Sequence, residues 1–272
     1  SSPSRGLGDV YKRQIIIGDV HGMSVELETL IRKLEIRGDD HIVFVGDLVD
    51  KGPDSAGVVK MVRELSETHD VVVVEGNHEE KHRRFRKHRV NGTGVDLTMK
   101  GSEEMSEITD GLSEEDVSFM ETFVPFHRVP EHGVLVVHGG IEGAMTEFPA
   151  TVEELRGMSS KKRKSFGKTM RTRFVDKDTG KFLQLGDQKE GDPFWAEVFD
   201  GRFGHVVFGH EPFMDGVGHF PHATGIDTGA VFGGELTAMV FEGTVPSFVS
   251  VKSRGKFCNC LLYTSDAADD IP

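Results

Sequence analysis

The chain has 272 residues, of which 37% are hydrophobic and 28% charged, and its formal net charge is −13. This acidic balance argues against binding to duplex DNA through bulk charge. The apolar runs are also far shorter than the roughly 20 residues that a membrane-spanning helix needs, so we expect no membrane partner.

The two ends of the chain resemble inverted copies of one DNA sequence. Asp9–Gln14 (DVYKRQ) can be back-translated as GATGTGTATAAGAGACAG, and the reverse complement of that string, shifted by one base, encodes Cys260–Ser265 (CLLYTS). We interpret residues 1–14 and 260–272 as sequencing-adaptor read-through and exclude them from functional reasoning. The single cysteine that remains, Cys258, excludes a disulfide framework and predicts a reducing, cytoplasmic setting.

The expected domain, residues 15–259, begins with alternating strands and helices. Continuous β-branched runs predict buried strands at Ile15–Ile17, Ile42–Val45 and Val71–Val74. Ser24 is typical of the N-cap of a helix after the first strand, and Gly38 is expected to end it. Asp54 or Ser55 caps the helix after the second strand. Strands separated by helices in this way predict parallel pairing and an α/β fold.

The rest of the domain is less regular. Residues 91–131 are mostly helical and polar in pattern, and Ser113–Phe123 opens on a capping-box signature. Residues 144–201 break the alternation and predict a helical cap inserted over the active site, with Trp195 in the core of the cap rather than in a nucleotide-stacking position. Further strands are expected at Val134–Val137, Val206–Phe208, His222–Asp227, Leu236–Phe241 and Ser247–Val251.

Candidate metal ligands stand at or just past the ends of these apolar runs. They are Asp19, His21, Asp47, Asn77, His138 and His210. The carboxyl ends of strands meet in one crevice of an open α/β sheet, so these side chains are expected to converge. Asp47 is the natural bridge between two divalent ions, and imidazole with carboxylate and amide oxygens suits manganese, iron or zinc. A water shared by two such ions is a hydroxide nucleophile near neutral pH.

Two further residues are expected to handle protons. His78 directly follows the ligand Asn77, so it is predicted to point into the substrate space and to protonate the leaving oxygen. Asp50 comes three residues after Asp47 and is placed to hold the other ring nitrogen of His78.

The same residues lie in motifs that resemble a known family. GDVHG, GDLVDKG and GNHE, with VVHGG and VVFGHEP, are similar to the calcineurin-like metallophosphoesterase superfamily and its phosphoprotein-phosphatase group. KGPDS, MRTRF and IDTGAVFGGELTAM resemble the ApaH-like phosphatases and diadenosine tetraphosphatases of that group. The resemblance covers nearly all of Ile15–Val251.

The resemblance implies a β-sandwich flanked by helices and a site for two metal ions. It implies that Asp19, His21 and Asp47 bind one ion, and that Asp47, Asn77, His138 and His210 bind the other. His78 would be the acid.

Two candidate phosphate contacts depart from the family pattern or remain open. Lys51 stands where the family usually has an arginine; lysine keeps the charge but loses the bidentate fork. The second phosphate-binding arginine is Arg171 or Arg173, and both lie on one face if 169–174 is extended.

Three functions fit this sequence. The first is hydrolysis of a phosphoanhydride in a nucleotide-type substrate, such as a dinucleoside polyphosphate, a capped RNA end or inorganic polyphosphate. The second is a serine/threonine protein phosphatase acting on a phosphoprotein with the same chemistry. The third, an inactive phosphate-binding scaffold, predicts lost ligands, and none is lost here. Two basic stretches, Lys81–Arg89 and Arg156–Arg173, are expected to be solvated faces.

Overall fold

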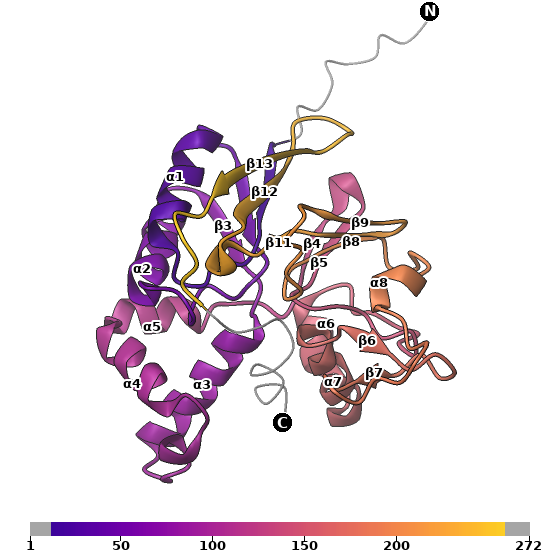
Figure 1. The fold of residues 1–272 in the computed structure, drawn as a ribbon, viewed down its shortest axis with the longest axis horizontal. Coiled ribbons are helices and arrows are strands. Elements are labelled where there is room, and N and C mark those ends of the chain that lie inside the picture. Colours follow the sequence, from indigo (N-terminus) through magenta and orange to yellow (C-terminus); the bar gives the residue numbers. More distant parts are fainter. Residues whose placement is uncertain (1–11, 259–272) are drawn as a thin grey trace, which may run out of the picture.

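A computed structural model describes residues 12–258, and its centre consists of two β-sheets (Figure 1). The first contains β1 (Gln14–Ile17), β2 (His41–Phe44), β3 (Asp70–Val73), β11 (Asp227–Thr228), β12 (Glu235–Phe241) and β13 (Ser247–Lys252). The second contains β4 (His127–Val129), β5 (Val134–Val136), β8 (His205–Phe208), β9 (Gly218–Phe220) and β10 (Ala223–Gly225). The strand orders are β11-β12-β1-β2-β3, with β13 beside β12, and β4-β5-β8-β10-β9.

Alternation along the strands explains why both faces of the first sheet are buried. Successive side chains of a strand point to opposite faces. In β1, Ile15 and Ile17 join the core that faces the helices, whereas Ile16 joins the core between the sheets. In β5, Leu135 packs outward under the cap segment, while its neighbours Val134 and Val136 pack between the sheets. The expected β-sandwich is therefore confirmed.

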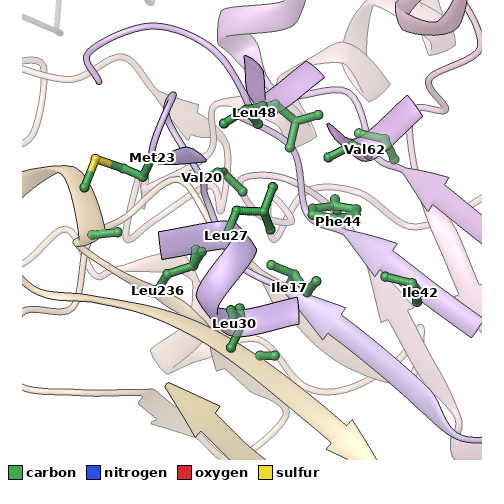
Figure 2. Packing of buried hydrophobic residues seen from close by; sticks show 14 of the residues in the cluster. Ile17, Val20, Met23, Leu27, Leu30, Ile42, Phe44, Leu48, Val62 and Leu236 are labelled. Atoms are coloured by element: carbon green, nitrogen blue, oxygen red, sulfur yellow. The ribbon is translucent and has the colours of Figure 1, made fainter. Parts of the chain in front are cut away.

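Helices cover the outer face of the first sheet. They are α1 (Ser24–Leu34) and α2 (Ser55–Ser66), with α5 (Glu114–Met120) beside α2. Beyond the end of the sheet lie α3 (Asn77–Val90) and α4 (Ser102–Gly111), with a 3-10 turn, η1 (Asp96–Thr98), between them (Figure 1). Figure 2 shows Leu27 and Leu30 of α1 directed toward Ile17 of β1. Burial of one such leucine contributes about 1.5–3 kcal/mol, so this core fixes α1 on the sheet.

The segment expected to be a cap packs on the outer face of the second sheet. It contains α6 (Val152–Gly157), α7 (Ser160–Phe166), η3 (Gly167–Met170), β6 (Phe174–Val175), β7 (Phe182–Leu183) and α8 (Trp195–Val198). The strands β6 and β7 form a hairpin around a turn at residues 177–179. Trp195 is 1% exposed and contacts the ring of Phe208, so it lies in the core of this layer, as predicted.

Several sequence expectations about element boundaries are wrong. The first helix begins at Ser24 after Met23, and it ends at Leu34 instead of Gly38, because Glu35 already has left-handed backbone (φ 47°). The single strand expected at His222–Asp227 is divided at Ile226, where the chain crosses from β10 in the second sheet to β11 in the first.

Four short strands, β4, β6, β7 and β9, were not predicted from the sequence pattern. β4 lies in the region expected to be helical, followed by the turn η2 (Pro130–His132), and it pairs antiparallel with β5. β9 pairs with the edge of β10. Another turn, η4 (Ala230–Phe232), separates β11 from β12. Between residues 12 and 258, no helix is both long and apolar enough to cross a membrane.

The predicted non-native ends fall largely outside the described residues. Within the described part, Gln14 is the first residue of β1, and Arg13 forms an ion pair with Asp40 at 2.5 Å. The interpretation of residues 1–14 and 260–272 therefore remains a prediction.

Candidate metal centre and active site

The loops after five strands bring polar side chains to one edge of the sandwich. Those after β1, β2 and β3 belong to the first sheet and those after β5 and β8 to the second. They carry all six candidate ligands, Asp19, His21, Asp47, Asn77, His138 and His210, none of which is more than 6% exposed. A buried cluster of this kind needs partners for its polar atoms, and a metal ion is one such partner.

Two groups of side chains place their ligand atoms within 4.8 Å of one another. The first ligand group is His21, Asp47 and His78, and the second is Asp47, His138 and His210. Asp47 Oδ2 lies 3.6 Å from His21 Nε2 and 3.2 Å from His138 Nε2. Asp47 is therefore shared by the two groups, which is the position that a bridging carboxylate requires.

Two other predicted ligands border the second group. Asn77 Oδ1 lies 3.1 Å from His138 Nε2. Asp19 Oδ2 accepts a hydrogen bond from the backbone N–H of His210 at 2.9 Å. Burial raises the pKa of Asp19 well above its usual value, and the negative charge of Asp227 adds to the shift. Asp227 is a further buried carboxyl that the sequence did not single out.

Unpartnered buried atoms test whether these residues suit a metal ion. Asp19 Oδ1 and His210 Nε2 are buried and have no hydrogen-bond partner among residues 12–258. His21 and His138 each direct Nδ1 to a backbone carbonyl, of Val49 and Val45 respectively, at 2.9 Å. These contacts turn each Nε2 toward Asp47, so the donor set fits a divalent transition metal.

The charge states of two of the three candidate histidine ligands, His21 and His210, agree with this fit. Burial, and then the ammonium of Lys51, lower the pKa of His21 to about 3 against the attraction of Asp47. Burial also lowers the pKa of His210 well below its usual value. Both rings are therefore neutral, which is the form that binds metals. Burial lowers the pKa of His138 too, but the carboxylate of Asp47 outweighs it and raises the pKa to about 9.

His78 lies at the start of α3, where two contacts orient its ring. Its Nδ1 lies 2.6 Å from Asp50 Oδ2, in the arrangement predicted from the sequence. The other oxygen of Asp50 lies 2.6 Å from His82 Nε2. Sequence reasoning assigned no site role to His82; its signal was the i, i+4 spacing from His78 on one helix face. Burial raises the pKa of Asp50, but hydrogen bonds from His78 and His82 outweigh it, so Asp50 stays ionised.

Glu79 is a second residue that sequence reasoning missed. Its buried carboxyl accepts hydrogen bonds from the backbone N–H groups of Asp47 at 2.8 Å, Leu48 at 2.7 Å and Gly76 at 3.0 Å. It therefore fastens the loop after β2 to the start of α3. Burial raises the pKa of Glu79 to about 7, and the charge of Asp47 adds to the shift. The capping-box spacing from Gly76 was the available signal.

The backbone at the site is unusual as well. Five of the six non-glycine residues with positive φ in residues 12–258 belong to it: His21, Asp47, Asp50, Lys51 and His210, with φ between 45° and 68°. Glycines allow the close approach of the loops, since a Cβ at Gly209 would collide with Asp19 Oδ1 and one at Gly76 with Asp47 Oδ1.

Comparison with known proteins identifies the family. The model of the calcineurin-like phosphoesterases matches residues 12–220. This chain belongs to that family. It is 32% identical over 258 residues to the bis(5'-nucleosyl)-tetraphosphatase PrpE [asymmetrical] of Oceanobacillus iheyensis, covering 89% of this chain and 93% of the relative. It is 34% identical over 257 residues to the protein of the same name from Halalkalibacterium halodurans, covering 88% and 93%.

Solved structures agree with this assignment. A structure provisionally assigned as a diadenosine tetraphosphatase superposes with a TM-score of 0.67 at 28% identity, covering 92% of this chain and 97% of that one. A serine/threonine phosphatase from Saccharomyces cerevisiae, at 13% identity and a TM-score of 0.57, shares the fold; the match covers 90% of this chain and 81% of that one. The chain is thus a hydrolase of the phosphoesterase family, as expected from its motifs.

The side chains of the two candidate arginines of this phosphoesterase bond to different residues. The segment 169–174 is not a continuous strand, so the expectation that both lie on one face of it is wrong. The turn η3 ends at Met170, and Arg171 (φ −132°, ψ 0°) follows it before β6 begins. Arg171 donates to Glu80 at 2.9 Å, whereas Arg173 donates to Glu211 at 2.9 Å and to the carbonyl oxygen of His210 at 3.0 Å. Arg173 therefore bonds to the loop of His210, whereas the backbone of Arg171 lies close to Gly139 in the loop of His138.

Lys51 lies at the border of the first ligand group. Its Nζ is 3.3 Å from His21 Nε2 and 5.5 Å from the ring centroid of Phe232. The ammonium of the phosphoesterase is therefore close enough to the candidate ligands to meet a phosphate held there.

The basic stretch on α3 is largely neutralised. Arg83, Arg86 and Arg89 form ion pairs with Glu75, Glu121 and Asp110, at 2.7, 3.0 and 2.8 Å. Because their charges are paired, these arginines of the phosphoesterase are better explained as the solvated face expected from the sequence than as a binding site for a polyanion.

Proposed function

We propose that this phosphoesterase hydrolyses a phosphoanhydride bond in a dinucleoside polyphosphate such as diadenosine tetraphosphate. The observation that carries the proposal is the pair of ligand groups that share Asp47. It is supported by relatives named bis(5'-nucleosyl)-tetraphosphatase, which this chain matches over 93% of their length. The asymmetry stated in the names of these relatives leads us to expect ATP and AMP as products, and not two molecules of ADP.

The proposed cofactor is a pair of divalent transition-metal ions, with manganese as the first choice. Asp19, His21 and Asp47 would hold one ion, and Asp47, Asn77, His138 and His210 the other. When bound, such ions supply Lewis acidity and an activated water. The deep burial of the donor atoms supports this assignment, because buried charge is stabilised by a cation.

His78 is the proposed acid. Asp50, ionised and 2.6 Å from Nδ1, fixes the tautomer in which Nδ1 carries a proton and keeps the ring in place. The carboxylates of Asp47 and Asp50 raise the pKa of His78 despite its burial. A charged imidazole can therefore deliver its Nε2 proton to the leaving phosphate oxygen, while Lys51 and Arg173 offset the charge of the phosphates.

The test is a comparison of substrates on the full chain loaded with Mn²⁺. We expect the highest kcat/KM on diadenosine tetraphosphate, with lower values on capped RNA, inorganic polyphosphate and a phosphoserine peptide. A preference for the phosphopeptide would overturn the proposal in favour of a protein phosphatase, and chromatography of the nucleotide products tests the asymmetry.

A further inference from the structure

A cavity of about 540 Å³ lies between α3 and the cap segment. We name it the cap cavity and define it by Glu80 and Arg84 of α3 together with Lys164, Lys168, Arg171 and Phe182 of the cap segment. Its size falls within the range of small-molecule sites, about 300–1,000 Å³.

The charge of the cap cavity suits an anion. Four cationic side chains line it, together with the two carboxylates Glu80 and Asp187, and one of the cations, Lys168, is paired with Glu142 at 3.2 Å. Glu80 serves both Arg171 at 2.9 Å and Arg84 at 3.7 Å. Lys164 is exposed and has no ion-pair partner within residues 12–258. The positive charge of the cap cavity is therefore only partly neutralised, and a phosphate chain could neutralise the rest.

An aromatic ring stands beside these cations. Phe182, on β7, is only partly buried, and the ammonium of Lys168 lies 5.9 Å from its ring centroid. Trp195, the other candidate for base stacking in the cap segment, is 1% exposed and already occupied by core contacts. Phe182 is thus the ring that can offer a face to a nucleobase.

The cap cavity is also connected to the candidate active site. Glu80 comes two residues after His78 on α3, and Arg84 six residues after it, which is about 9 Å along a helix. The turn before Arg171 is tied to the ligand loop after β5, since the N–H groups of Gly139 and Gly140 both donate to Thr169, at 2.9 and 2.7 Å. The turn before Arg171 therefore places one wall of the cap cavity next to the ligand loop after β5, where a chain of phosphates could pass from one to the other.

We propose that the cap cavity binds the distal nucleoside of the substrate, with its base on Phe182 and the phosphates beside it on Lys164 and Arg171. This inference rests on the proposed function. It adds the part of the protein that would make the enzyme prefer a dinucleotide to a mononucleotide.

The experiment compares diadenosine tetraphosphate with adenosine 5′-tetraphosphate, which has the same phosphate chain and one nucleoside. The readout is the ratio of the two kcat/KM values. Phe182→Ala should lower this ratio about tenfold, the effect of one lost base stack, and Phe182→Trp should preserve it. Lys164→Glu should raise KM for both nucleotides, while Lys161→Glu, on the same helix but outside the cavity lining, should change neither.

The outcomes separate the two proposals. If the wild-type chain cleaves both nucleotides and Phe182→Ala leaves the ratio unchanged in a folded protein, the inference is wrong and the proposed function stands. Equal effects of Lys164→Glu and Lys161→Glu would likewise overturn the phosphate contact. If the wild type cleaves the phosphopeptide but neither nucleotide, both proposals fall.

Discussion

The candidate metal centre and the cap cavity are neighbours with opposite construction. The metal centre is built from strand-end loops of both sheets, its six predicted ligands are almost fully buried, and backbone hydrogen bonds fix its rings. The cap cavity is built from long side chains on two helices (α3 and α7), a turn and a short hairpin, several of them exposed. The proposed bond cleavage thus depends on side chains with little conformational freedom. The proposed recognition of the rest of the substrate depends on exposed side chains, whose substitution should change the stability of the fold little.

The contrast between the two regions predicts that the largest loss of activity follows substitution of the shared ligand, Asp47. Asp47→Asn keeps an oxygen and tolerates the positive φ, but removes the bridging charge, so kcat should fall by at least about 1,000-fold. In wild type, Mn²⁺ at 100 times its Kd should stabilise the fold by about 2.7 kcal/mol and raise Tm by roughly 5–10 °C. The variant should lose most of that shift in a thermal melt. Full activity would refute a site in which Asp47 is shared.

His78 is the next test, because the geometry allows it two roles. Its Nε2 lies 3.9 Å from Asp47 Oδ2, within the first ligand group, although the sequence predicts an acid. As the acid, His78→Ala should lower kcat by about 100- to 10,000-fold and leave bound manganese unchanged by elemental analysis. Loss of metal together with activity would make His78 a ligand instead.

The sequence predicted for a physical reason that the candidate ligands lie close together. Ligands such as Asp19 and His138 follow strands, and parallel strands bring their carboxyl ends to one edge whatever the details of the loops. His82 was not predicted, because its i, i+4 spacing from His78 places both rings on one face of α3 but does not show that a loop residue such as Asp50 lies between them.

The cap segment was predicted only in outline. Arg171 and Arg173 seemed to share a face, but a 3-10 turn before them sends one to Glu80 and the other to Glu211. The cavity around Phe182 depends on how a short hairpin packs, which residue spacing does not encode. End points such as Glu35 were missed because left-handed backbone at a glutamate has no sequence signature.

Lys51 borders the candidate metal centre, and its substitution should have an intermediate effect. Lys51→Ala removes the ammonium near His21 and should lower kcat/KM about tenfold on every phosphate substrate. Lys51→Arg should recover activity, because a guanidinium restores the charge and adds the bidentate fork. Steady-state kinetics of both variants provides the check; an unchanged Lys51→Ala enzyme would mean that the residue does not meet phosphate.

The smallest effects should distinguish the two arginines. Arg173 bonds to the loop of His210, so Arg173→Ala should reduce kcat/KM for all substrates by about tenfold. Arg171 borders the cap cavity, so Arg171→Ala should raise KM by only about threefold, and only for nucleotides with a long phosphate chain. Comparing diadenosine tetraphosphate with p-nitrophenyl phosphate measures the difference. The reverse order would place the substrate on the other side of the site.

The left-handed backbone of His21, Lys51 and His210 has a consequence for protein engineering. Each costs roughly 1–2 kcal/mol relative to an ordinary conformation, so the folded protein is less stable than its core alone would make it. A selection for heat resistance that ignores turnover should therefore accumulate glycine or asparagine at these positions. The selected variants would be more stable and less active. Their substitutions would identify the residues on which the chemistry depends.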